Sequence, residues 1–267
     1  MLYFVATPIG NLNDISNRAL ETLKSVDLIA CEDTRHSLKL LNAYDIKKPL
    51  IAYHKFNEKK QAEVIIEELK KGKNVAIISD AGMPVISDPG NTLTKMLSSE
   101  GIEYTVIPGP SAFICALLLS GLDASRFTFI GFLPEKSKDK ESLLQEYKNH
   151  KETLIFYSAP HDVNGDLQSL YKVFGDRQAV AVKEITKIHE TVYRFSLKDA
   201  KIEEPKGEFV LLVEGAKEVQ EKGFELTEEE HINLYLSRGF SKKDAIKKVA
   251  EERNVSKNSL YKYTIDK

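Results

Sequence analysis

The chain has little cysteine and almost no excess of charge, and each shortage excludes a class of protein. Its 267 residues contain two cysteines, Cys31 and Cys115, which lie far apart and have no clustered histidine or cysteine beside them. That spacing fits neither a zinc motif nor a disulfide framework, so we expect a reducing compartment and no bound metal. The formal net charge of −2 gives no overall nucleic-acid signature. Contact with a polyanion therefore requires a local basic patch.

Long apolar segments are missing as well. The longest apolar run, 112–119, is far shorter than the roughly 20 residues needed to cross a bilayer. The chain starts with a strand-like stretch, 2–6, and lacks the basic leader of a signal peptide. A composition with 42% apolar and 29% charged residues is ordinary for a protein that buries a full core. We expect a soluble, cytoplasmic protein that does not bind membranes.

Short apolar runs alternate with helical patterns in the first part of the chain. The expected strands are 2–6, 28–31, 50–53, 75–78 and 104–107. Strands that are apolar throughout and separated by helices indicate a largely parallel sheet, because parallel strands need long crossovers. This part is predicted to be an N-terminal α/β domain, residues 1–120.

The pattern changes after Gly121. The expected strands here are 127–133, 153–158, 179–184, 191–196 and 209–214, and no good helix separates the last two. This arrangement predicts a mixed sheet with antiparallel pairs, in a second α/β domain over 121–222. Three short helices are expected in the polar remainder, 223–267, at 227–237, 241–253 and 256–263.

Four polar turns rich in small residues follow strands of the first domain, at 7–11, 32–35, 79–82 and 108–111. Ligands of parallel sheets bind beyond the carboxyl ends of the strands, so these turns predict a binding site. The segment 79–90 is the most informative, because its small residues let the backbone approach a ligand and its two prolines stiffen it. A rigid strand–helix connection is the alternative. No phosphate-loop or dinucleotide glycine motif is present, which argues against a nucleotide triphosphatase or an ordinary NAD enzyme.

The turn 32–35 places two carboxylates and a guanidinium at a strand end. Arg35 is interpreted as a contact to a substrate phosphate. For Asp33, substrate positioning and capping of the next helix are equally supported. His54 and His189 are interpreted as structural hydrogen-bonding groups.

The C-terminal region carries a local basic patch. Residues 238–262 contain eight lysines and arginines against three acidic residues. An apolar stripe over 245–250, a turn at Asn254 and Val255, and a helix start at Ser256 resemble a helix-turn-helix, whose second helix could contact nucleic acid. The alternative is a basic helical cap that packs against the second domain or another subunit. The candidate RNA contacts of this tail are Lys242, Lys243, Lys247 and Lys257.

The order of these motifs resembles the tetrapyrrole methylase family of S-adenosylmethionine-dependent methyltransferases. The motifs are 5–12, 31–35, 79–90 and 107–112. With the basic tail, the whole chain is similar to the branch of small-subunit ribosomal RNA (cytidine-2′-O)-methyltransferases. The resemblance implies two α/β domains with the cofactor in the cleft between them, a helix-turn-helix-like end, a homodimer, and ribosomal RNA or the small subunit as partner. Porphyrin-methylating relatives carry a Gly-Pro-Gly-Asp-type first motif, which 6–11 replaces, and this disfavours a tetrapyrrole substrate.

The resemblance also implies the residues that bind S-adenosylmethionine. From the first domain these are Pro8, Ala81, Gly82, Met83, Pro84, Ser87, Asp88, Ser111 and Ala112. From the second domain they are Tyr157, Ser158, Ala159, Lys183 and Gly207. Met83 stands where the branch commonly has threonine, so only a backbone contact is expected there.

Methyl transfer to a ribose hydroxyl requires alignment and a proton acceptor, because the hydroxyl is a poor nucleophile at neutral pH. The candidate bases are Asp80, Asp33 and Glu184, and Asp80 is favoured because it adjoins the cofactor loop. The 2′-hydroxyl distinguishes RNA from DNA, so DNA is not expected as a substrate. Two alternatives stay open: a tetrapyrrole methyltransferase of the same fold, and a non-enzymatic nucleic-acid-binding protein.

Overall fold

The computed structural model describes residues 1–217, 226–253 and 255–263. The chain divides into two compact units, Met1–Ala216 and Lys217–Lys267. The expected domain boundary at 222/223 and the predicted turn residue Asn254 lie outside the described residues. Within the described ranges, every helix is too short or too polar to cross a lipid bilayer.

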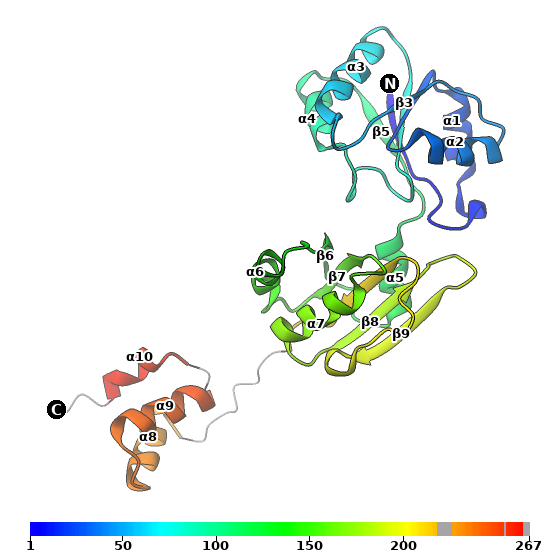
Figure 1. The fold of residues 1–267 in the computed structure, drawn as a ribbon. Helices are drawn as coiled ribbons and strands as arrows, with labels where there is room; N and C mark the ends of the chain where they lie inside the picture. The colour runs from blue at the N-terminus through cyan, green and yellow to red at the C-terminus, as the bar shows by residue number, and fades with distance from the viewer. Residues whose placement is uncertain (218–225, 254, 264–267) are drawn as a thin grey trace. The chain divides into compact units, whose positions relative to one another are not determined.

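The first sheet has five strands in the order β3-β2-β4-β1-β5. Figure 1 labels its two edge strands, β3 and β5. They are β1 (Leu2–Val5), β2 (Leu28–Cys31), β3 (Leu50–Ala52), β4 (Val75–Ile78) and β5 (Tyr104–Ile107). All four pairings are parallel, so the predicted parallel sheet is confirmed. The carboxyl ends of its strands consequently share one edge.

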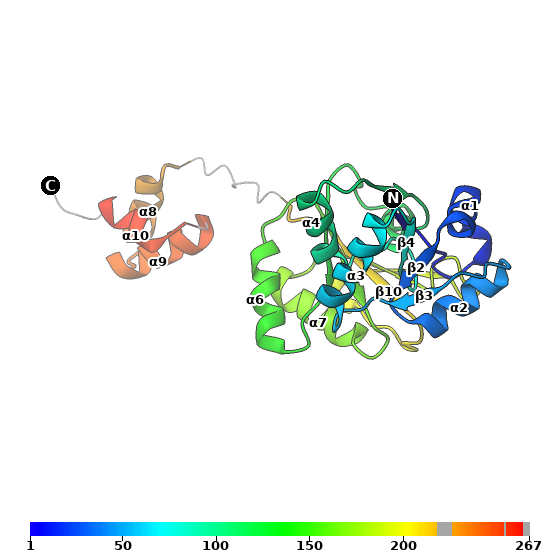
Figure 2. The same cartoon turned by 90° about the horizontal axis from the view of Figure 1, so that it is seen from above.

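Helices cover both faces of the first sheet (Figure 2). On one face lie α1 (Asn17–Ser25) and α2 (Thr34–Ala43), and on the other α3 (Glu58–Lys70) and α4 (Asn91–Ser99). Alternate strand residues point to opposite faces: Val5 packs with α1 and α2, whereas Phe4 packs with α3 and α4. A short turn of 3-10 helix, η1 (Leu12–Asp14), precedes α1.

The second sheet is mixed, as predicted, with the order β6-β7-β10-β8-β9. Its strands are β6 (Phe127–Phe132), β7 (Thr153–Ser158), β8 (Gln178–Lys183), β9 (Thr191–Ser196) and β10 (Phe209–Val213). Only β6 and β7 pair in parallel, and the other neighbours are antiparallel. The 3-10 turn η2 (Leu197–Asp199) follows β9.

Helices also cover both faces of the second sheet. One face packs against α6 (Ser137–Tyr147) and α7 (Val163–Phe174). The opposite face packs against α5 (Ala112–Ser120), where Ala116 and Leu117 join Ile155 and Val180 in one apolar cluster. α5 is apolar on nearly every side, and the side that carries Ala116 and Leu117 packs on the second sheet, although the predicted boundary at 120 assigns this helix to the first domain.

The C-terminal unit has a small core of its own. The expected three helices are present as α8 (Glu228–Ser237), α9 (Lys242–Arg253) and α10 (Lys257–Leu260), followed by η3 (Tyr261–Tyr263). Ile232, Ile246 and Leu260 form the core with neighbouring alanines and valine. Thr227 caps α8 in a reciprocal capping box with Glu230. The last α-helix has only four residues, which is short for a helix that enters a nucleic-acid groove.

Candidate functional site

The loops that follow the strands of the first sheet meet at one edge, as the sequence predicts. Thr7 and Gly82 form an antiparallel bridge, with N–H···O distances of 2.9 and 3.1 Å. The Asp33 N–H donates to Asp80 Oδ1 at 3.4 Å. Gly109 lies against Ala6, and a Cβ on this glycine would come within 2.8 Å of the Ala6 Cβ. The four turns at 7–11, 32–35, 79–82 and 108–111 therefore lie together at this edge of the sheet, and we call them the rim.

The loop 79–90 of this rim has a strained backbone. Gly82 has a φ of +80°, which glycine adopts easily, but Val85 and Ser87 also have positive values, 75° and 67°. Positive φ is rare for a β-branched residue. Gly90 leaves no room for a side chain because Val85 fills the space beside it. Backbone strain of this kind is concentrated at binding and catalytic sites, where the surrounding structure maintains it.

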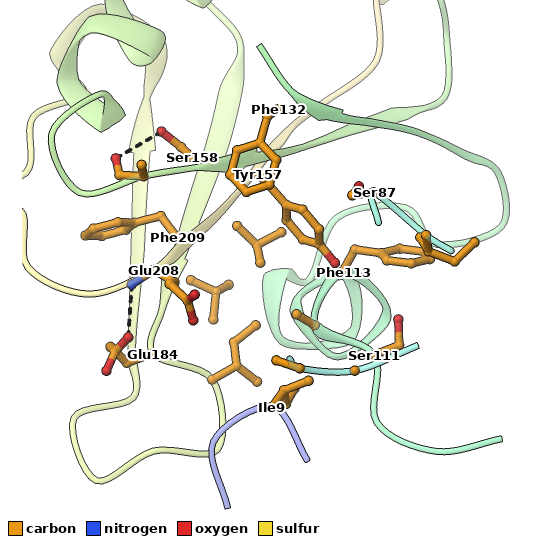
Figure 3. Close-up of a pocket in the computed structure, with 18 of the residues that line it drawn as sticks. Ile9, Ser87, Ser111, Phe113, Phe132, Tyr157, Ser158, Glu184, Glu208 and Phe209 are labelled. Atoms are coloured by element: carbon orange, nitrogen blue, oxygen red, sulfur yellow. Dashed lines mark hydrogen bonds between the residues drawn. The ribbon is translucent and has the colours of Figure 1, made fainter. Parts of the chain in front are cut away.

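A pocket of about 400 Å³ lies between this rim and the α5-covered face of the second sheet. Figure 3 shows Ile9, Ser87 and Ser111 on one side of it and Glu184 and Phe209 on the other. Its volume is typical of sites that enclose a small organic molecule. Most of the predicted site residues line its wall: Asp80, Ala81, Gly82, Met83, Ser87, Asp88, Ser111, Ala112, Tyr157, Ser158, Ala159 and Glu184. Their individual contacts with a ligand stay predictions.

Four predicted cofactor contacts lie beside the wall rather than in it. Pro8 and Pro84 are buried within the loops. Lys183 shares the strand face of Ala179 and Ala181, which packs toward α6 and α7, because side chains alternate along β8. Gly207 has a φ of +79°, and the Glu184 carboxylate occupies the space beside it. In each case an adjacent residue in the chain reaches the pocket instead.

The apolar part of the wall was not found from the sequence. It comprises Ile9, Phe113, Phe132, Val182, Phe209 and Val210. Tyr157 contacts Phe132 with ring centroids 5.4 Å apart, and burial raises the pKa of its hydroxyl to about 12. Strand alternation groups Val182 with Val210 on one face. The missing information was which face of the second sheet meets the first domain.

Four carboxylates line the pocket, against a single lysine. Lys187 Nζ bonds to Glu184 Oε1 at 2.9 Å and to Glu208 Oε2 at 3.2 Å. Glu184 Oε1 also accepts from the Glu208 N–H at 2.9 Å (Figure 3). Asp80 and Asp88 remain on the opposite side, so the wall carries a net negative charge. Such a wall favours a ligand with positive charge.

The carboxylates differ in their affinity for protons. Burial, reinforced by the charge of Glu32, raises the pKa of Asp88 to about 6. Burial also acts to raise the pKa of Glu184, but the Glu208 N–H and the Lys187 ammonium outweigh it and hold that pKa below its ordinary value. Asp88 therefore gains and loses its proton closer to neutral pH than an ordinary aspartate does.

Asp33 caps α2 and lies outside the pocket wall. Its Oδ1 accepts from the Arg35 N–H at 2.8 Å, and its Oδ2 accepts from the Arg35 guanidinium at 3.1 Å. These bonds lower the pKa of Asp33 to about 2. Asp33 therefore caps α2, which is one of the two roles that the sequence left open for it. Arg35 itself has 89% of its side chain exposed, where a phosphate can reach it.

The residues present fit S-adenosylmethionine. This cofactor combines a positively charged sulfonium and ammonium with one carboxylate and an adenine ring, so its net charge is positive. The acidic wall complements the charges, and Phe113, Phe132 and Phe209 supply apolar surface for the ring. Gly82, with no side chain, lets the loop backbone approach the cofactor closely.

Comparison with known proteins decides the family. The profile of the tetrapyrrole (corrin/porphyrin) methylases matches residues 1–201. The chain belongs to this family. The family and its named relatives establish S-adenosylmethionine as the cofactor, in agreement with the sequence analysis.

Several relatives carry the name "Ribosomal RNA small subunit methyltransferase I". The protein of that name from Bacillus subtilis is 43% identical, over 98% of this chain and 92% of its own length. The one from Haemophilus influenzae is 44% identical, over 98% of this chain and 95% of its own. The one from Thermotoga maritima is 44% identical, over 80% of this chain and 98% of its own.

Solved structures show the same fold at lower identity. The methyltransferase CobJ superposes with a TM-score of 0.62 at 18% identity, over 80% of this chain and 94% of CobJ. Diphthine synthase gives a TM-score of 0.61 at 17% identity, over 80% of this chain and 89% of that protein. The predicted fold class, two α/β domains of the tetrapyrrole methylase type, is confirmed.

The basic residues of the C-terminal unit differ in accessibility. The candidate RNA contacts Lys242, Lys243, Lys247 and Lys257 are exposed. Arg253 instead points inward, where its guanidinium donates to Thr227 O at 3.0 Å and to His231 Nδ1 at 3.1 Å. It holds α9 to the start of α8. Contact between the exposed lysines and RNA stays a prediction.

Proposed function

We propose that this protein transfers the methyl group of S-adenosylmethionine to the 2′-hydroxyl of a cytidine ribose in small-subunit ribosomal RNA. The observation that carries the proposal is identity of 43–44% to proteins named for small-subunit ribosomal RNA methylation, over 98% of this chain. The acidic pocket supports it, because it suits a cationic methyl donor. The likeness to CobJ and diphthine synthase supports the fold alone.

In this proposal, different pocket residues bind the methyl donor and accept the proton. When bound, the cofactor supplies an electrophilic methyl group on a positively charged sulfur. The loop 79–90 and α5 hold the methyl donor, and Asp80 accepts the proton of the ribose hydroxyl. Glu184 and Asp33 are weaker acceptors, because Lys187 and Arg35 already neutralise their carboxylates.

The C-terminal unit adds affinity for RNA rather than catalysis. The Thermotoga maritima relative aligns over nearly all its length and leaves a fifth of this chain unmatched. Lys217–Lys267 makes up about that share of the chain. The pocket lies wholly in Met1–Ala216, so a relative of the shorter length can contain the complete site.

The protein acts as a cytoplasmic homodimer in this proposal. Apolar side chains are exposed on β5, where Tyr104 and Val106 lie on the edge strand, and on α5, where Leu118 exposes 74% of its surface. The proposal takes α5 as the contact, because Leu118 is the most exposed of the three and a second copy of the chain supplies the same apolar group.

Radiolabelled methyl transfer tests the function. Small ribosomal subunits from cells that lack the modification are incubated with labelled donor, beside porphyrinogen and DNA. We expect label in the RNA, recovered after nuclease digestion as 2′-O-methylcytidine. Label on a base, or in porphyrinogen but not RNA, would contradict the proposal. DNA binding without affinity for the methyl donor would favour a non-enzymatic protein.

A further inference from the structure

A second surface feature lies outside the pocket, in the segment 54–60 between β3 and α3. Phe56 exposes 94% of its surface there. A single exposed apolar side chain needs no explanation in itself. The surroundings of this ring are unusual, however, because the turn that carries it is fixed and its neighbours are basic.

The turn that carries Phe56 is held by Asn57. Asn57 Oδ1 accepts from the His54 N–H at 2.9 Å, and Asn57 Nδ2 donates to Ala52 O at 3.0 Å. The Phe56 ring lies edge-to-face with the His54 ring, at a centroid distance of 6.1 Å. His54 Nε2 lies 3.3 Å from Asn57 Nδ2, within hydrogen-bonding distance, whereas the buried His54 Nδ1 has no hydrogen-bond partner among the described residues. A ring presented on a rigid turn loses little conformational entropy on binding.

The same segment is bonded to the end of the pocket loop. Glu58 Oε1 accepts from the Gly90 N–H at 2.9 Å and from the Thr92 N–H at 3.0 Å. Asp88 of the pocket wall stands two residues before Gly90. Glu58 thereby fixes the position of Phe56 relative to the pocket. An RNA that contacts both Phe56 and the pocket is therefore held in one position along its sequence.

Basic side chains surround the ring. Lys55, Lys59 and Lys60 are exposed, and within the described part of the chain none of them forms an ion pair. They line a shallow depression of about 470 Å³ together with Phe56, Glu58, Glu63 and two uncharged residues. The three lysines outnumber Glu58 and Glu63, so the depression carries a net positive charge.

We propose that Phe56 is a stacking platform for an unpaired base of the RNA substrate, flanking the nucleotide that is methylated, and that Lys55, Lys59 and Lys60 bind its phosphates. The inference rests on the proposed function, because it takes RNA as the substrate. Aromatic rings among lysines are the usual recognition surface for single-stranded nucleic acid. A duplex hides the faces of its bases, so the site takes a splayed or single-stranded nucleotide.

Three substitutions of Phe56 distinguish stacking from other contacts. Phe56→Ala removes the ring, Phe56→Leu keeps an apolar side chain without a π face, and Phe56→Tyr keeps the ring. Methyl transfer to undermethylated small subunits gives KM and kcat, and calorimetry gives the affinity for S-adenosylhomocysteine. We expect Phe56→Ala and Phe56→Leu to raise KM about 5- to 100-fold and Phe56→Tyr to stay near wild type. The kcat and the cofactor affinity stay unchanged.

Salt dependence separates the ring from the lysines. The affinity for subunits falls as the salt concentration rises. Replacing Lys59 and Lys60 by Gln makes the plot of log affinity against log salt less steep by about 2, whereas Phe56→Ala leaves its steepness unchanged. Tyr171→Ala on α7 is the matched control, since this exposed aromatic residue lies on the helix that covers the far face of the second sheet. We expect Tyr171→Ala to change neither the KM for subunits nor the salt dependence of binding.

Four outcomes overturn the inference: an unchanged KM in Phe56→Ala, a Phe56→Leu variant as good as Phe56→Tyr, an unchanged slope in the lysine variant, or a loss of kcat or cofactor affinity. The second would mean that the ring packs on an apolar protein surface. Failure of the proposed function is recognised separately, because the wild-type protein then transfers no methyl group to subunits.

Discussion

Carboxylates of one pocket have different tasks because their neighbours differ. Asp80 lies two residues after the end of β4, and its Oδ1 accepts from the Asp33 N–H at 3.4 Å. Glu184 is paired with a lysine, and Asp88 is desolvated beside other acidic groups. A base must be accessible to the substrate and free of a permanent cation, and Asp80 meets both conditions.

Replacing Asp80 by Asn tests this assignment. Asn keeps the size of the side chain but accepts no proton at neutral pH, so kcat should fall about 100-fold or more. The affinity for S-adenosylhomocysteine should stay within about twofold, as measured by calorimetry. Glu208→Gln is the control, since its carboxylate lies on the lysine side of the pocket. Unchanged turnover in Asp80→Asn would remove Asp80 from the role of base.

We predict that Asp88 makes cofactor binding depend on pH. Its pKa is raised to about 6, so it is protonated below that value and negatively charged above it. The ionised form attracts the sulfonium, which the demethylated product lacks. The affinity for S-adenosylmethionine relative to S-adenosylhomocysteine should therefore rise up to about fivefold as the pH increases through 6.

Asp88→Asn is the matched variant for this prediction, because it removes the titrating carboxyl and keeps its shape. Calorimetry at pH 5 to 8 should show a flat affinity ratio for the variant. The raised pKa also affects stability. Because the pKa of Asp88 is higher in the folded protein than in the unfolded chain, its contribution to the free energy of unfolding decreases as the pH rises from about 4 to 6. A ratio that falls with pH in the wild type would contradict the account.

At the scale of elements, the strands and turns of the first sheet were predictable, whereas the second half of the site was not. Apolar runs such as 75–78 end at glycine- and proline-rich turns, and parallel pairing then brings those turns together. Lys187 and Phe209 gave no such signal, because their place depends on how the second sheet packs against the first. The family resemblance located Tyr157 and Glu184, which spacing alone did not.

α5 has two functions in this account, since one side packs on the second sheet and the other stays exposed. Leu118→Glu places a charge on the exposed side, away from Ala116 and Leu117. Sedimentation should then show a shift from dimer to monomer, with a melting temperature changed by only a few degrees. A wild-type protein that is already monomeric, or a variant that stays dimeric, would show that this surface is not the interface.

At the scale of the whole molecule, the proposed function assigns the reaction to Met1–Ala216 and part of the RNA binding to Lys217–Lys267. Truncation before Gly223 removes the exposed lysines of α9 and α10 and leaves the pocket intact. KM for small subunits should rise and its salt dependence should flatten, while the affinity for S-adenosylhomocysteine persists. Normal RNA affinity in the truncated protein would mean that the C-terminal unit is a structural cap.

The central claim is that the pocket between the strand-end loops and the second sheet holds the methyl donor. Calorimetry with S-adenosylhomocysteine tests it most directly, on the wild type and on Ala81→Phe, which fills the pocket from an exposed position. We predict one bound molecule per chain for the wild type and at least about 100-fold weaker binding for the variant, with melting temperature retained. No heat of binding to the wild type, or equal affinity in the filled variant, would contradict the account.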